Sequence, residues 1–358
     1  MRCSVFAVLT LVGCNQILGV SDPHLHDPND ASNAADARSD SAPVADGASC
    51  YGTGFVTECF TSPLVGTLTI TPQTLNTDTS TLCEVQSMTA CVVATGNLTV
   101  AAGTLSVIGT KPLVLIAGNT LTVTGILDVA SHLTGQRGAG AVPVTDTTRC
   151  DLGVLSASSS GGGAGGSFGS LGGNGGGSTA GVRGAIKPAA LRGGCAGQDN
   201  TPGANVKGMG GGAVYLIAGA RIVVTGSING SGAAGMTSTT SGGGGGGGSG
   251  GLIGLDAPAI TNSGAIFANG GGGASASAGS SLPPGQNGNE SVNGAAAPAT
   301  GSIAGGGGGA ARGVAAGAGV TAPIFTSGGG GGGGGVGIIG VVLPGSLSGS
   351  GIVSPSPS

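Results

Sequence analysis

The sequence predicts an all-β fold: a right-handed parallel β-helix-like solenoid with glycine-rich loops, preceded by a signal peptide and a disordered tether. Three observations support this fold class. Segments of about twenty residues repeat a strand–turn–strand pattern, the size of one solenoid rung. Glycine accounts for 82 of the 358 residues. Large side chains are too scarce to fill a wide core, since there is no Trp and only 2% of residues are aromatic.

Residues 1–13 have the features of an export signal. A positive charge at Arg2 precedes a short apolar run, residues 4–12, which is too short to span a bilayer. The small residues before Cys14 resemble the lipobox of bacterial lipoproteins. That resemblance implies a diacylglyceryl group on the Cys14 thiol, and Asn15 after it favours the outer membrane. We expect a lipid-anchored protein of the outer membrane or cell surface; the alternative is a periplasmic or secreted protein with an ordinary signal.

Residues 14–49 are predicted to form a disordered acidic tether, because residues 22–49 are rich in Asp, Ala, Ser and Pro and have no apolar period. His24 and His26 lie there beside two aspartates; a solvated linker is favoured over a weak metal site, so we expect no metal and no cofactor. The first 49 residues hold six of the 15 acids and two of the 11 bases. The rest of the chain is therefore neutral, which argues against nucleic acid as a partner.

Six cysteines remain after the signal and the lipidated residue: Cys50, Cys59, Cys83, Cys91, Cys150 and Cys195. An even number in an exported chain suggests disulfides, and six cysteines allow fifteen pairings. Proximity in sequence favours Cys50–Cys59, Cys83–Cys91 and Cys150–Cys195. The spacings lack the close pairs of zinc sites.

Residues 50–358 are predicted to form one glycine-rich all-β repeat domain, with a Cys-stapled cap at 50–95. Four segments that start at Pro112, Gly212, Gly251 and Val336 can be aligned. In each, apolar residues alternate along short strands that a glycine interrupts, as expected for strands with one buried face. A β-sandwich is the main alternative for residues 50–135.

Glycine tracts lie between the repeats, at 160–184, 242–251, 270–274, 305–309 and 328–335. Two arrangements are open: mobile loops on one face of the solenoid, or extended polyglycine II-like strands packed side by side. The low charge nearby favours packing.

The stretch from Gly246 to Gly272, the run from Cys50 to Gly54 and residues 113–132 resemble glycine-rich predicted surface lipoproteins of Gram-negative bacteria. The resemblance covers residues 50–345. The tracts are also superficially similar to those of PE-PGRS proteins, but the PE head domain of that family is absent, so no kinship follows.

No catalytic constellation is predicted. The G-x-G-x-x-G matches belong to polyglycine, and no helix and spaced acid follow them. The carboxylates that could serve glycoside hydrolysis are scattered; they are Asp128, Asp146, Asp151, Asp199 and Asp256. Convergence of Asp128, His132 and Asp151 is conceivable, but surface charges and turn caps are the favoured interpretation.

We therefore expect a non-enzymatic cell-surface lipoprotein with a structural or adhesive role. Its expected partners are the membrane, through the anchor, and extracellular matrix or other copies of itself. The alternative is a carbohydrate-active β-helix enzyme, which rests on analogy of fold alone.

Overall fold

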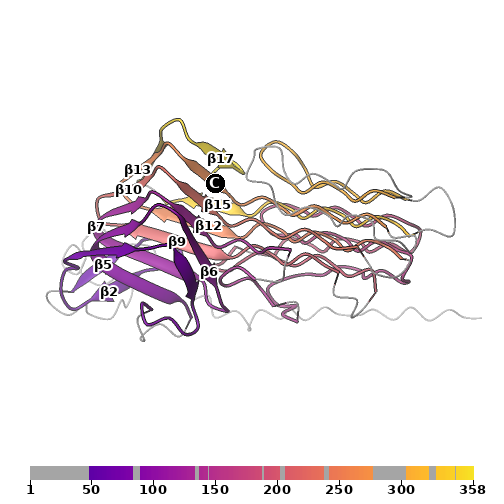
Figure 1. Cartoon of the computed structure of the whole chain (residues 1–358), viewed down its shortest axis with the longest axis horizontal. Helices are drawn as coiled ribbons and strands as arrows, with labels where there is room; N and C mark the ends of the chain where they lie inside the picture. Colours follow the sequence, from indigo (N-terminus) through magenta and orange to yellow (C-terminus); the bar gives the residue numbers. More distant parts are fainter. Residues whose placement is uncertain are drawn as a thin grey trace, which may run out of the picture. The chain divides into compact units, whose positions relative to one another are not determined.

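The computed structural model describes residues 48–83, 89–133, 137–143, 145–187, 189–201, 206–237, 242–276, 304–321, 328–342 and 344–358 (Figure 1). The predicted signal peptide, Cys14 and nearly all of the predicted tether lie outside these residues. All of the described residues belong to one compact unit, Asp46–Ser358.

The described residues form strands and no helix. The strands are β1 (Ser49–Tyr51), β2 (Glu58–Phe60), β3 (Thr67–Ile70), β4 (Gln73–Asn76), β5 (Cys91–Val100), β6 (Thr104–Ile108), β7 (Leu113–Val123), β8 (Ile126–Asp128), β9 (Ala213–Ala218), β10 (Arg221–Val224), β11 (Ser227–Asn229), β12 (Leu252–Asp256), β13 (Ala259–Asn262), β14 (Ala265–Phe267), β15 (Ile338–Val341), β16 (Leu347–Ser348) and β17 (Ile352–Ser354).

Two large sheets contain most of these strands. A nine-stranded sheet has the order β15-β12-β9-β7-β10-β13-β16, with β5 beside β7 and β3 beside β5. A six-stranded sheet has the order β17-β14-β11-β8-β6-β4. The pairs in both sheets are parallel, whereas β1 and β2 form a separate antiparallel hairpin.

The predicted right-handed β-helix-like solenoid with glycine-rich loops is wrong. The parallel sheets curve into a nearly closed, barrel-like layer. Within it, β5 pairs along one edge of β7, whereas β9 and β10 pair with the first and second halves of its other edge. The repeats do share one register, since Leu121, Ile222, Ile260 and Leu347 are successive partners. However, long tracts intervene between the repeats, and their described segments, such as 160–169 and 193–201, bond to one another instead of forming short loops. The parallel pairing of β3 to β8 also excludes the antiparallel sandwich as the fold of residues 50–135.

The main core lies between the two large sheets. Leu98, Leu121 and Ile222 of the larger sheet and Leu127 and Ile228 of the smaller one are at most 1% exposed and belong to one apolar cluster. In the second halves of the repeats, buried and more exposed residues alternate along the strand. One face of these strands packs on the core and the other meets solvent. The first halves are continuous apolar runs, because β9 and β12 are buried on both faces.

A second apolar cluster covers the outer face of β7, β9 and β12. It contains Val114, Tyr215 and Leu252, and Tyr51 and Phe60 of the β1–β2 hairpin pack against it. Of the predicted cap at 50–95, only this hairpin is separate from the large sheets, since β3, β4 and β5 are members of them.

The glycine tracts form an ordered body, which we call the glycine bundle. Its extended segments run side by side beyond the strands in Figure 1. The segments are 160–169, 172–176, 193–201, 206–212, 230–237, 242–251, 268–276, 304–311, 314–321 and 328–337.

Hydrogen bonds in the bundle repeat every third residue. In segment 328–337, the N–H groups of Gly329, Gly332 and Gly335 donate to segment 160–169 at 2.7, 2.9 and 2.9 Å. The N–H groups of Gly330 and Gly333 donate to segment 314–321, and those of Gly331, Gly334 and Gly337 donate to segment 268–276. This period of three is that of a polyproline II-type helix, whose backbone has no internal hydrogen bonds and must bond to neighbours.

Segment 328–337 is surrounded by six neighbours, because its carbonyl groups also accept from three further segments: 172–176, 242–251 and 304–311. Segment 242–251 has an equivalent interior position. These two segments are the purest glycine runs of the chain. A Cβ on Gly331 would collide with the carbonyl oxygen of Gly245, and similar collisions recur along both runs. Glycine is required there because neighbours approach from every side.

Candidate functional site

Asp128 and His132 are the two members of the conceivable catalytic group that lie together. The Nε2 atom of His132 is 2.9 Å from Oδ2 of Asp128, and the Nδ2 group of Asn229 donates to Oδ1 of Asp128 at 3.2 Å. Asp151 instead accepts hydrogen bonds from the backbone N–H groups of Gly153 and Ala185, at 2.8 and 2.9 Å. The side-chain partners of Asp128 are thus His132 and the amide of Asn229. Neither is the second acid that glycoside hydrolysis usually needs.

Asp146 and Asp199 contact residues that follow them closely in the sequence. Asp146 accepts from the Thr148 hydroxyl at 2.6 Å and contacts Arg149 Nε at 2.5 Å. These contacts, the Thr148 hydroxyl first, hold the pKa of Asp146 well below its usual range. Asp199 contacts Nζ of Lys207 at 2.5 Å. Among the described residues, no three His, Cys, Asp or Glu side chains are grouped so that they could hold a metal ion.

Asp256 fastens the β1–β2 hairpin to the larger sheet. Its Oδ2 accepts from the backbone N–H of Thr53 at 2.6 Å and lies 3.4 Å from the hydroxyl of Tyr215. Burial, and then the negative charge of Asp256, raises the pKa of Tyr215 to about 12. The Tyr215 hydroxyl also accepts from the N–H of Phe55 at 3.3 Å, so the disulfide-closed loop is held at two points.

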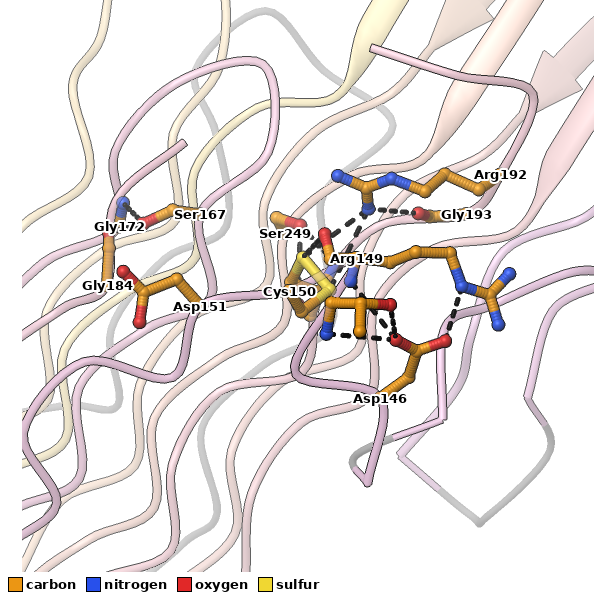
Figure 2. The surroundings of a disulfide bond; sticks show 12 residues. Asp146, Arg149, Cys150, Asp151, Ser167, Gly172, Gly184, Arg192, Gly193 and Ser249 are labelled. Atoms are coloured by element: carbon orange, nitrogen blue, oxygen red, sulfur yellow. Dashed lines mark hydrogen bonds and ion pairs between the residues drawn. A yellow bond between two sulfur atoms is a disulfide. The ribbon is translucent and has the colours of Figure 1, made fainter. Parts of the chain in front are cut away.

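Arg192 is a buried cation beside a disulfide (Figure 2). Only 2% of the residue is exposed, and its guanidinium carbon lies 4.3 Å from the centre of the Phe168 ring. Its Nη1 is 3.5 Å from the sulfur of Cys195 and 3.7 Å from that of Cys150. Nη1 also donates to the Gly193 carbonyl at 3.1 Å, whereas no acceptor in the described structure binds Nη2.

The surroundings of Arg192 lower its pKa to about 10, with burial as the first cause and the charge of Arg149 as the second. The group therefore keeps its charge at neutral pH, stabilised by an aromatic face and a carbonyl. The disulfide that it contacts joins the turn at Arg149 to segment 193–201 of the glycine bundle. This cluster is consequently a structural fastening of the bundle.

An apolar groove lies where the larger sheet meets the glycine bundle. It consists of two adjoining hollows of about 670 and 620 Å³ that share Gly169 and Ile186. Phe55 and Phe168 line the first hollow, and Leu171 and Val314 line the second. Ile186 is 47% exposed and Leu171 is 42% exposed, so large apolar side chains meet solvent along the groove.

Basic side chains border the apolar groove. Lys187 lines the first hollow, and Arg183 and Arg312 line the second. The described residues that line the two hollows include no Asp or Glu. The groove therefore combines apolar walls with positive charge.

The six cysteines beyond Cys14 form three disulfides: Cys50–Cys59, Cys83–Cys91 and Cys150–Cys195. These are the pairs that proximity in sequence favoured. Cys14, His24 and His26 lie outside the described residues. None of the described segments forms a helix with the length and apolarity needed to cross a bilayer.

Comparison with known proteins gives no relative: no protein-family model, curated protein or solved structure matches the chain. The sequence interpretation missed the apolar groove and the buried Arg192. A signal for the groove was present, because Leu171 and Ile186, which line it, are isolated large apolar residues in a stretch of small ones. Arg192, next to two glycines and close to Cys195, gave a weaker signal.

Proposed function

We propose that this chain is a non-enzymatic, lipid-anchored surface protein with a structural or adhesive role. In this proposal Cys14 carries the anchor, residues 14–49 form the spacer, and the remaining residues form a rigid body held away from the membrane. Three disulfides agree with an oxidising compartment outside the cytoplasm.

The observation that carries the proposal is the six-neighbour packing of segments 242–251 and 328–337. Backbone hydrogen bonds to surrounding segments recur along both segments, and at their glycines an added methyl group would collide with a neighbouring backbone. A body built in this way is rigid without a large apolar core. Rigid presentation of surface side chains suits a contact role, since little conformational entropy is lost when a partner binds.

Contact with partners would use side chains and not bare glycine backbone. In the outer segment 314–321, Gly319 faces inward, where a Cβ would collide with the carbonyl oxygen of Gly330. Ala315, Ala318 and Val320 are exposed on the same segment. Their methyl groups prevent close approach of a further glycine segment, much as protected edge strands resist added strands.

The test uses cells that display the full chain, compared with cells that carry Cys14→Ser. Intact mass spectrometry first establishes whether Cys14 of the membrane-bound protein carries a diacylglyceryl group. We expect wild-type cells to bind extracellular matrix material or each other, and the Cys14→Ser cells to lose this adhesion while they release folded protein. Equal adhesion of both cell types, or no adhesion by either, would refute the proposed role.

A further inference from the structure

We propose that the apolar groove binds a single-chain lipid with an anionic headgroup, the acyl chain lying along Ile186 and the headgroup near Lys187 and Arg312. This inference goes beyond the proposed surface role and does not depend on acylation of Cys14. It rests on the shape, the lining and the charge of the groove.

The shape fits an elongated ligand. The two hollows adjoin at Gly169 and Ile186, so the groove continues from Phe55 on the β1–β2 hairpin to Val314 on the bundle. Each hollow has a volume in the range of small-molecule pockets, about 300–1,000 Å³. Glycines at 169, 313 and 340 keep the floor free of side chains.

The backbone along the groove favours an acyl chain over a peptide. A bound peptide must satisfy its own N–H and C=O groups, usually on a free strand edge. The edge of β15 is already occupied: Ser358 donates to the Ile339 carbonyl at 2.9 Å and accepts from the Val341 N–H at 3.3 Å. The carbonyl of Val336 likewise accepts from Gly169 at 2.9 Å. An acyl chain needs no hydrogen bonds, and burial of its CH₂ groups against the apolar lining favours binding.

The charge specifies the headgroup. Three basic side chains border the groove, whereas no Asp or Glu side chain is among its described lining residues. The side chain of Arg183 is partly engaged, since Nη1 donates to the Gly172 carbonyl at 3.2 Å. The backbone N–H of Arg312 donates to the Ser354 hydroxyl at 2.9 Å, and Arg312 lines the second hollow. Asp151 interacts electrostatically with Lys187, but its oxygens already accept from Gly153 and Ala185. Positive charge that borders both hollows of an apolar groove complements a carboxylate or phosphate.

The experiment uses the full chain carrying Cys14→Ser, so that no acyl group of its own competes. Calorimetric titration with laurate below its micelle concentration is compared with titration by dodecyl maltoside, a neutral amphiphile of equal chain length. We expect saturable binding of laurate that weakens at high salt, and at least tenfold weaker binding of the neutral probe.

Two variants locate the site. Ile186→Glu places an acid where the two hollows meet and should weaken laurate binding at least tenfold. Lys187→Gln combined with Arg312→Gln should weaken it about three- to tenfold, as expected for loss of charge-assisted contacts. Val65→Glu, at a residue 80% exposed outside the groove, and Arg221→Gln on β10 are the matched controls. Circular dichroism and intact disulfides establish that each variant is folded.

Absence of saturable laurate binding would overturn the inference, as would equal binding of the neutral probe. Laurate binding that Ile186→Glu leaves unchanged would place the ligand elsewhere and also overturn it. Sedimentation distinguishes one further outcome: a dimer that Ile186→Glu converts to monomers, without laurate binding, would make the groove a contact between copies of the chain.

Discussion

Gly332→Ala tests whether the glycine bundle is packed as closely as its hydrogen bonds indicate. Gly332 lies in the interior segment 328–337, where its N–H donates to Gly163 and its carbonyl accepts from Gly247, both at 2.9 Å. A methyl group there would collide with the Gly173 carbonyl oxygen and lie 2.7 Å from that of Asn174, whereas ordinary contact begins near 3.4 Å. The neighbouring backbones must move apart, because no flexible side chain can yield.

The cost follows from overpacking and from weakened hydrogen bonds. Overpacking costs about 1–3 kcal/mol, and each net hydrogen bond contributes about 0.5–1.5 kcal/mol. Alanine also lowers the conformational entropy of the unfolded chain, which offsets about 0.4–1 kcal/mol of this loss of stability. We expect Gly332→Ala to lower the free energy of unfolding by about 2–4 kcal/mol.

Gly340→Ala is the matched control. Gly340 has no heavy atom within 4 Å of an added Cβ, and it lacks a positive φ. The same chemical change should therefore leave stability unchanged or raise it by up to about 1 kcal/mol.

Urea unfolding, followed by far-ultraviolet circular dichroism with the disulfides intact, measures both variants. Hydrogen exchange with mass spectrometry then compares protection of segments 242–251 and 328–337. Gly332→Ala should reduce protection in both segments. If Gly332→Ala and Gly340→Ala are equally stable and equally protected, the close packing of the bundle is refuted.

Three further predictions concern the fastenings of the fold. Joint replacement of Cys150 and Cys195 by serine removes a link across 45 residues and should lower the free energy of unfolding by about 4 kcal/mol, measured in urea without reductant; a loss below about 1 kcal/mol would contradict the cross-link argument. Arg192→Met removes a buried charge whose Nη2 has no partner in the described structure and keeps an apolar stem against Phe168, so stability should stay within about 1 kcal/mol or rise; a loss above about 2 kcal/mol would show that the sulfur contacts hold the fold. Tyr215 keeps its proton in the folded state to about pH 12, whereas an ordinary tyrosine loses it near 10. Stability from this group is therefore fully present below pH 10 and is lost as the pH rises toward 12. Absorbance titration should show a late-ionising tyrosine that Tyr215→Phe removes, and titration of the variant identical to that of wild type would disprove the assignment.

The strand register could be predicted from the sequence. Alignment of the repeats placed Leu121, Ile222 and Ile260 at equivalent positions, and these residues are successive partners in one sheet. The alternation of apolar residues reports burial directly, because strand side chains point to opposite faces. The arrangement of the strands into two sheets could not be predicted in this way. The apolar pattern within a strand does not specify the path of the chain between repeats.

The partners of the glycine segments are not encoded in any side-chain pattern. Segment 328–337 consists of nearly uniform glycine, so its neighbours are chosen by the geometry of the other segments. The apolar groove was hidden for a related reason. Ile186 and Val314 lie far apart in the sequence, and only the docking of segment 314–321 beside segment 172–176 brings them to one surface.

The proportion of glycine in a segment nevertheless indicates whether that segment lies inside the bundle or at its surface. A segment at the surface of the bundle needs glycine only on its inner side, as the exposed alanines in 314–321 show. A segment with six neighbours needs glycine at nearly every position, and the exception in 242–251 is informative. Ser249 is fully buried, and its hydroxyl accepts from the Cys195 N–H at 2.8 Å beside the Cys150–Cys195 disulfide. The longest pure runs therefore mark the bundle interior. Because segment 328–337 bonds to segments spread from residue 160 to 320, the bundle closes only when this last tract takes its place.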